Sequence, residues 1–116
     1  MTLPNKQRNE LTITLGDKTY LVKPTFNFIA QIEDYFDEPL TEIVLGKLQT
    51  GRIKVSEIAT IIAAGIEGAG GTPDMEEIKE AIADAGTIIA IDAIAQLLTN
   101  SFSGPKINTK STDKKK

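Results

Sequence analysis

The 116-residue chain contains no cysteine, no histidine and no tryptophan, and only 5% of its residues are aromatic. These absences exclude disulfides, a cysteine nucleophile, and zinc or iron–sulfur sites that need thiolate or imidazole ligands. They also exclude a catalytic triad built on histidine. Any enzyme chemistry would have to use carboxylates, lysine, tyrosine or hydroxyl groups. A chain without cysteine says nothing about its redox compartment.

Long apolar runs are missing as well. The two longest, 58–66 and 88–98, are interrupted by Thr60 and Asp92. Both are shorter than the ~20 residues that a membrane-spanning helix needs. The polar N-terminus also lacks the apolar segment of a secretory signal. The sequence therefore predicts a soluble protein that has no membrane partner and works where it is made.

The formal net charge of −3 hides an uneven distribution. Residues 103–116 carry five lysines against one aspartate, a net charge of +4, whereas residues 1–102 carry eight basic and fifteen acidic residues, a net charge of −7. Phosphate backbones repel an acidic body, so nucleic acid is not expected as a partner. The lysine-rich segment is typical of a solvated tail.

The chain is long enough for one domain and too short for two. Polar residues 1–8 are predicted to form a flexible lead-in, residues 9–102 a single domain, and residues 103–116 a disordered basic tail. The predicted fold class is α+β and mostly α, with an N-terminal β-hairpin packed on about five short helices.

The hairpin prediction rests on two short β-type runs. Apolar and hydroxyl residues alternate in Leu11–Leu15, which is the period of a half-buried strand. Gly16-Asp17 follows as a turn in which glycine supplies the positive φ, and Tyr20-Leu21-Val22 forms the second run. An isolated hairpin is only marginally stable, so helices must cover the face that carries Leu11, Ile13 and Leu15.

The first three helices follow from the apolar period after Thr25, which is expected to cap the first. Asp37-Glu38-Pro39 is expected to end that helix, because a residue before proline avoids the α region. Gly51 is expected to end the second helix. In the third, Gly65 belongs to a narrow apolar stripe and allows neighbouring helices to approach closely. The stripe consists of Ile58, Ile61, Ile62, Gly65 and Ile66.

The last two helices have the clearer start signals. Thr72 and Pro73 are expected to begin the fourth, and Thr87 to cap the fifth, which extends to about Phe102. The fifth helix is apolar on two faces, so it is either central in the core or half of an interface. One face carries Ile88, Ile91, Ala95, Leu98 and Phe102, and the other carries Ile89, Ala93 and Leu97.

Acidic clusters are the nearest thing to a catalytic or metal site. Paired carboxylates can act as general acid and base or bind Mg²⁺ and Ca²⁺. In the fourth helix, however, Glu76, Glu80 and Asp84 lie opposite its apolar face, which is typical of a solvated helix side. Glu33, beside Ile32 in the first helix, is a candidate partner contact. No cofactor, metal or small-molecule substrate is expected.

Two further patterns do not support their usual functions. The glycines at 65–71 lack the lysine and the preceding strand of a phosphate-binding loop. The helices around Gly51-Arg52 resemble a helix-turn-helix only in outline, because Glu57 stands where base-reading helices carry hydrogen-bond donors. A small DNA-binding regulator and a stand-alone enzyme remain as alternatives from other functional classes.

The order of elements resembles the gene-transfer-agent tail protein family, which is classed with phage tail assembly chaperones. The resemblance spans residues 11 to about 103 and has no catalytic signature. This chain has Asp37-Glu38 before Pro39 where the family often has a glycine. The similar segments are Leu15–Tyr20, Pro24-Thr25-Phe26, Ile32-Glu33, Leu40–Ile43, Ile58–Ile66 and the acidic fourth helix.

The resemblance implies a non-enzymatic tail assembly chaperone that binds the tape measure protein in the host bacterial cytoplasm. Such a chaperone keeps its client soluble and leaves before the tail is complete, so it is expected to be absent from the mature virion. The candidate contact face is Ile89, Ala93 and Leu97, because an apolar client needs a complementary helix face. The alternative is a structural tail component, a tube or connector subunit that stays in the virion. Other tail proteins are further candidate partners, and a homo-oligomer is compatible with the sequence.

Overall fold

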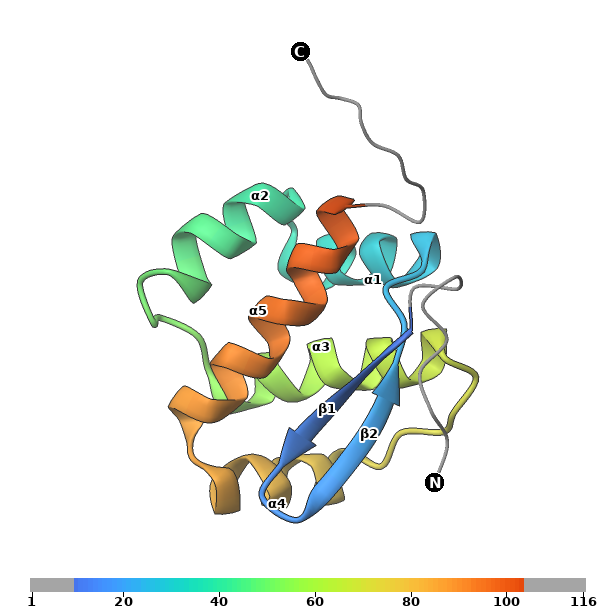
Figure 1. Cartoon of the computed structure of the whole chain (residues 1–116). Helices are drawn as coiled ribbons and strands as arrows, with labels where there is room; N and C mark the ends of the chain where they lie inside the picture. The colour runs from blue at the N-terminus through green and yellow to red at the C-terminus, as the bar shows by residue number, and fades with distance from the viewer. Residues whose placement is uncertain (1–9, 104–116) are drawn as a thin grey trace.

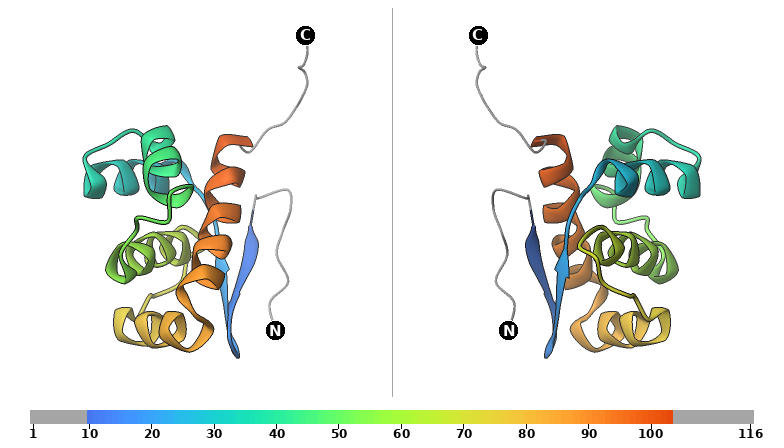
Figure 2. Two further views of the ribbon diagram at one scale, coloured as in Figure 1. Left: turned by 90° about the vertical axis from the view of Figure 1, so that its left-hand side faces the viewer. Right: turned by 90° about the vertical axis from the view of Figure 1, so that its right-hand side faces the viewer.

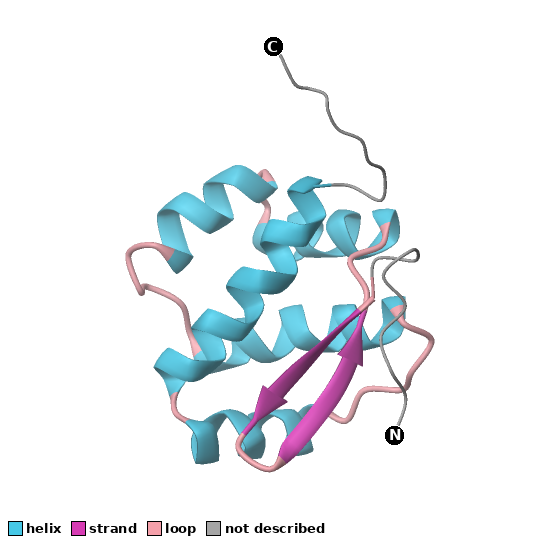
Figure 3. Ribbon diagram, viewed as in Figure 1, coloured by secondary structure: helices cyan, strands magenta, loops and turns pink. Residues whose placement is uncertain are grey.

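The computed structural model describes residues 10–103 (Figure 1). It confirms the predicted α+β, mostly α fold: a two-stranded hairpin followed by five helices, the second of which continues into a π-helical turn (Figure 3). The predicted lead-in lies outside the described residues, as does the predicted tail apart from Ser103. The elements are β1 (Leu11–Leu15), β2 (Lys18–Val22), α1 (Phe26–Phe36), α2 (Leu40–Ile43) with its π-helical continuation η2 (Val44–Leu48), α3 (Val55–Gly68), α4 (Met75–Ala85) and α5 (Thr87–Ser103).

The hairpin turns at Gly16-Asp17, as predicted. β1 and β2 pair antiparallel, with Leu11 opposite Val22 and Leu15 opposite Lys18. Gly16 has φ +64, a conformation that costs glycine little and that a two-residue hairpin loop requires. The second strand begins at Lys18, two residues before the predicted apolar run, because each strand residue needs a partner across the turn.

The inner face of the hairpin closes one side of the core. Ile13, Leu15 and Val22 are buried, whereas Thr12 and Thr14 are exposed, which confirms the alternation predicted for β1. β1 contacts α4 and α5, and β2 contacts α3. The helices therefore supply the cover that a two-stranded sheet needs.

α3 is the centre of the fold. It contacts α1, α4, α5 and β2. In Figure 1 it lies behind α5 and the hairpin, and in the side views of Figure 2 α5 lies between it and the hairpin. Its buried surface is wider than the predicted narrow stripe, because neighbours pack on several sides and bury two alanines as well. The buried residues of α3 are Ile58, Ala59, Ile61, Ile62, Ala64, Gly65 and Ile66.

At Gly65, both β2 and α5 approach α3 closely. A Cβ on Gly65 would lie 3.0 Å from Val22 Cβ and 3.0 Å from Leu97 Cδ2. The Lys23 N–H also donates a hydrogen bond to the Gly65 carbonyl, with an N···O distance of 2.9 Å. The predicted close approach at Gly65 is therefore confirmed, and a strand takes part in it together with a helix.

The predicted helix starts are partly right. The Thr25 side chain caps α1 by accepting a hydrogen bond from the Phe28 N–H at 3.0 Å, as expected. The prediction for α4 is wrong, because Asp74 is its N-cap and accepts from the Glu76 and Glu77 N–H groups. Thr87 is the first residue of α5, so it does not cap that helix.

The second helix contains a π-helical turn that the sequence pattern did not indicate. It begins at Leu40 as an α-helix and continues through Val44–Leu48 with i→i+5 geometry. Ile43 and Leu48, five residues apart, are both buried. The wider turn thus brings both side chains to the core, and Leu45 faces outward between them.

α5 runs alongside the hairpin and lies in front of α3 in the view of Figure 1. Its core face carries Ala90, Ile94, Leu97 and Leu98, all buried. The predicted division into two apolar faces is wrong, because Ile88 is 81% exposed and Leu97 and Leu98 both lie in the core. The buried set follows an i, i+4, i+7, i+8 spacing, which places these four residues on one helical face.

Candidate interaction surface

The predicted contact residues Ile89, Ala93 and Leu97 do not form one exposed face. Leu97 is fully buried against Gly65, so it is removed from the predicted surface. Ile89 is 52% exposed and Ala93 is partly buried. The buried face of α5 runs along the helix from Ala90 to Leu98, so only exposed positions beside it, such as Ile89 and Gln96, are available for contact.

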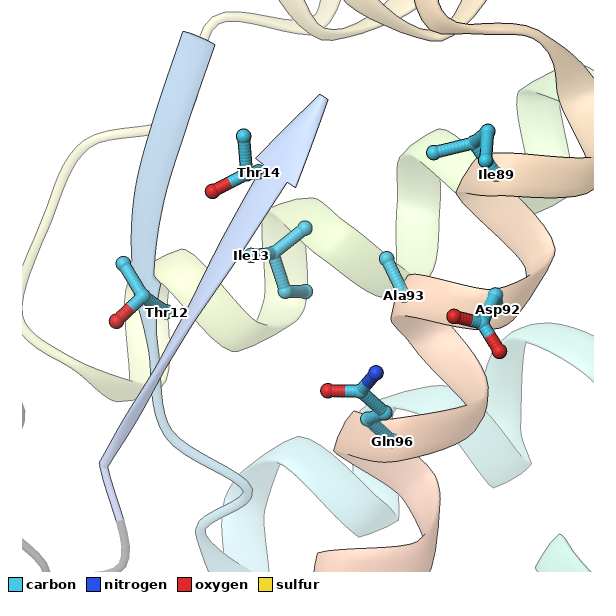
Figure 4. Close-up of a pocket in the computed structure, with 7 residues that line it drawn as sticks. All are labelled: Thr12, Ile13, Thr14, Ile89, Asp92, Ala93 and Gln96. Carbon is cyan, nitrogen blue, oxygen red and sulfur yellow. The ribbon is translucent and has the colours of Figure 1, made fainter. Parts of the chain in front are cut away.

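Ile89 and Ala93 line a groove between α5 and β1 (Figure 4). The groove has a volume of about 260 Å³, with one wall from the strand and the other from the helix. Its lining combines threonine hydroxyls, apolar side chains and two polar helix residues. The full lining is Thr12, Ile13, Thr14, Ile89, Asp92, Ala93 and Gln96.

The fourth predicted contact residue, Glu33, has an intramolecular partner. Its Oε2 atom accepts a hydrogen bond from the Leu40 N–H at 2.8 Å, across the turn between α1 and α2. The carboxylate thus satisfies one of the free N–H groups at the start of α2, where negative charge is also favoured by the helix dipole. Glu33 and the groove beside Ile89 belong to separate parts of the molecule.

Asp37 shapes the same turn. It ends α1 in the left-handed conformation, with φ 57 and ψ 39, and its N–H donates to the Glu33 carbonyl. The resemblance placed a glycine near this point in related proteins, and the backbone here adopts the conformation that glycine favours. The predicted helix end at Asp37-Glu38-Pro39 is confirmed.

The acidic residues have local structural roles or face the solvent. Glu76, Glu80 and Asp84 are exposed, as the pattern predicted. Glu57, which argued against a DNA-reading helix, accepts from the Lys54 N–H at 2.9 Å and lies 3.5 Å from Lys47 Nζ. Within residues 10–103, no cluster of three or more acidic side chains is arranged to hold a metal ion.

Glu77 joins the hairpin to α4, a contact that the sequence did not indicate. Its Oε2 atom lies 3.3 Å from Lys18 Nζ and accepts a hydrogen bond from the Tyr20 hydroxyl at 3.5 Å. Burial raises the pKa of Tyr20 above its ordinary value of 10.0, and the negative charge of Glu77 raises this pKa further. These interactions connect the turn end of the hairpin to the fourth helix.

Large apolar side chains are exposed at several helix starts. Phe26, the first residue of α1, is 88% exposed, and Ile88 near the start of α5 also lies on the surface. The other exposed large apolar side chains of the described chain are Tyr35, Leu45, Val55 and Ile89. Among residues 10–103, no single helix is long and apolar enough to cross a bilayer. α4 and α5 together have the length and composition of a membrane span, but the pair is bent by 117°.

Comparison with protein families matches residues 8–104 to the family described as phage tail tube protein, GTA-gp10. The match covers most of the 116 residues and the whole described fold. The chain belongs to this family. The comparisons with curated proteins and with solved structures found no match.

Membership in the tail tube family confirms the predicted resemblance to phage and gene-transfer-agent tail proteins, and it corrects the function drawn from that resemblance. A tail tube protein is a structural component, so the predicted role as a tail assembly chaperone that binds the tape measure protein is wrong. The expected absence from the mature virion is wrong for the same reason, because tube proteins are part of the particle. The alternative, a structural tail component, agrees with the family.

Proposed function

We propose that this protein is a structural subunit of the tail of a phage or gene transfer agent, and that it is retained in the mature particle. The observation that carries the proposal is the match of residues 8–104 to the tail tube family. The compact, acidic domain and its exposed apolar positions suit a subunit that is held in place by contacts with other proteins.

We further propose that the protein has no enzymatic activity and that its partners are other tail proteins. The chain has neither cysteine nor histidine, and its described carboxylates point to the solvent or bind neighbouring groups. Surface contact needs no reactive group. The tape measure protein as a specific partner stays a prediction that no observation tests.

Quantitative mass spectrometry of purified particles tests the proposal. Particles are banded on a density gradient, and the abundance of this chain is compared with that of other tail and head proteins. We expect the chain in a fixed ratio to the other tail proteins across independent preparations. Its absence from intact, infective particles would overturn the proposal.

Tailless heads purified in the same way are the matched control. A structural tail subunit is expected in complete particles and missing from such heads. Equal amounts in both preparations would show that the chain is carried over from the lysate or belongs to the head.

A further inference from the structure

The outer edge of β1 carries unpaired backbone groups. The sheet has two strands, so each strand has a neighbour on one side only. In a hairpin with a two-residue loop, Leu15 and Lys18 form a hydrogen-bonded pair and the pairs then alternate. The N–H and C=O groups of Thr12 and Thr14 therefore point away from β2. Among residues 10–103 they form no hydrogen bond to another segment.

β1 lacks the features that protect strand edges in most proteins. Natural edges are guarded by charged residues, proline or bulges, and Leu11–Leu15 contains none of these. The edge of β2 differs, because that strand contains the charged residue Lys18. The β2 edge also borders a hollow shared with the connector at 69–72. β1 is therefore the edge that is open to a further strand.

The sequence of β1 is self-complementary. Leu11-Thr12-Ile13-Thr14-Leu15 reads the same in both directions. If two copies pair antiparallel about Ile13, Thr12 of one copy lies opposite Thr14 of the other, and Leu11 lies opposite Leu15. In this register the outward N–H and C=O groups of both threonines form hydrogen-bonded pairs. Threonine pairs across strands are themselves favourable.

The charge of β1 and the space beside it both suit pairing with a second copy of β1. A strand without charge gains nothing from a strongly charged partner, and in this register Glu10 lies opposite Gly16, so no like charges meet along the strand. The groove of about 260 Å³ between β1 and α5 gives the incoming strand room beside the edge (Figure 4). Ile89, half-exposed beside this groove, is then covered by the second copy.

We propose that two copies of this chain associate by antiparallel pairing of their β1 edges about Ile13, which makes one continuous four-stranded sheet. The interface is isologous, so each copy presents the same strand to the other. This association goes beyond the proposed place in the tail and is independent of it. A chain that stays monomeric in solution and yet is found in particles would overturn the pairing and leave the structural role intact.

Charge-swapped variants of the full chain test the interface and its register. Thr12 and Thr14 are exposed, so Thr12→Lys/Thr14→Lys and Thr12→Glu/Thr14→Glu preserve the core. Each variant alone places like charges opposite each other, and their mixture places opposite charges in the same positions. By sedimentation velocity, we expect wild type to dimerise, each variant to associate at least roughly tenfold more weakly, and the mixture to regain association.

Thr19→Lys is the matched control, because Thr19 is an exposed threonine on the outer edge of β2. It should dimerise like wild type. Circular dichroism establishes that each variant is folded. A wild-type chain that remains monomeric at high concentration would overturn the proposal, as would variants that dimerise as strongly as wild type. A mixture that fails to associate would overturn the proposed register.

Discussion

Gly65 of α3 and Leu97 of α5 meet so closely that even a methyl group at position 65 would crowd the contact. A Cβ on Gly65 would lie 3.0 Å from Leu97 Cδ2, which is closer than ordinary van der Waals contact. Val22 approaches the same position from the hairpin. Three segments that are far apart in the sequence therefore share one contact point. They can approach this closely because residue 65 is a glycine and has no side chain.

Gly65→Ala is expected to destabilise the protein by about 1–3 kcal/mol, because the added methyl group overpacks this contact. The loss should exceed the gain of up to ~1 kcal/mol that alanine brings to a helix interior. Urea denaturation followed by circular dichroism measures the difference. Gly46→Ala is the control, since a Cβ there meets nothing within 4 Å. Equal effects of the two substitutions would contradict the packing explanation.

Asp37→Gly is expected to stabilise the protein by up to about 1 kcal/mol. Asp37 has φ 57, and the left-handed region carries a steric cost for residues with a Cβ. Thermal unfolding of the variant measures the gain. Asp34→Gly is the matched control, because Asp34 lies inside α1, where glycine costs about 1 kcal/mol. The explanation fails if both variants shift the unfolding temperature in the same direction.

Glu33→Ala is expected to lower the free energy of unfolding by roughly 1 kcal/mol, because the Leu40 N–H loses its acceptor. Glu33→Gln retains an acceptor oxygen and should lose less. Asp34→Ala, one residue along α1 and exposed, should change stability by less than about 0.5 kcal/mol. Chemical denaturation compares the three variants, and a loss in Asp34→Ala as large as in Glu33→Ala would argue against the capping role.

Tyr20 is expected to ionise above its ordinary pKa of 10.0, because burial and the neighbouring Glu77 disfavour the phenolate. Titration by phenolate absorbance in a Tyr35→Phe background follows Tyr20 alone, since the chain has two tyrosines. Glu77→Gln should bring the pKa part of the way back, leaving the effect of burial. No change in Glu77→Gln would show that the carboxylate does not act on Tyr20.

The raised pKa of Tyr20 makes the free energy of unfolding depend on pH. Because the folded state holds the Tyr20 proton more tightly than the unfolded state, its contribution to stability is complete below pH 10.0. The contribution is lost as the pH rises from there through the folded-state pKa. Tyr20→Phe should remove this part of the alkaline decline in the unfolding free energy, and an unchanged decline would contradict the linkage.

Most of the fold could be predicted from local sequence signals. The alternation in Leu11–Leu15, the glycine at position 16 and the cap at Thr25 each act within a few residues, and each is confirmed. The errors arose where packing decides. The apolar residues of α5 are numerous enough to suggest two faces, and only contact with Gly65 and the hairpin selects Leu97 for the core.

The candidate surface was less predictable than the fold. The sequence pattern of an apolar helix residue does not show whether its side chain contacts another helix or the solvent. The pattern therefore did not distinguish the exposed Ile89 from the buried Leu97. The hydrogen bond from Leu40 to Glu33 crosses a turn that the pattern marks only as a helix break. The groove beside β1 needs two elements that are remote in the chain, and a local pattern does not indicate such a pairing.

The order of the contacts has a consequence for synthesis. β1 is covered by α4 and α5, which are made after the other described elements. While a ribosome is still translating α5, the apolar side chains of Ile13 and Leu15 have no complete cover, although the strand has long since emerged. Chains that stop before α5 should therefore be prone to aggregation and proteolysis, and folding is completed only when the final helix closes over the first strand.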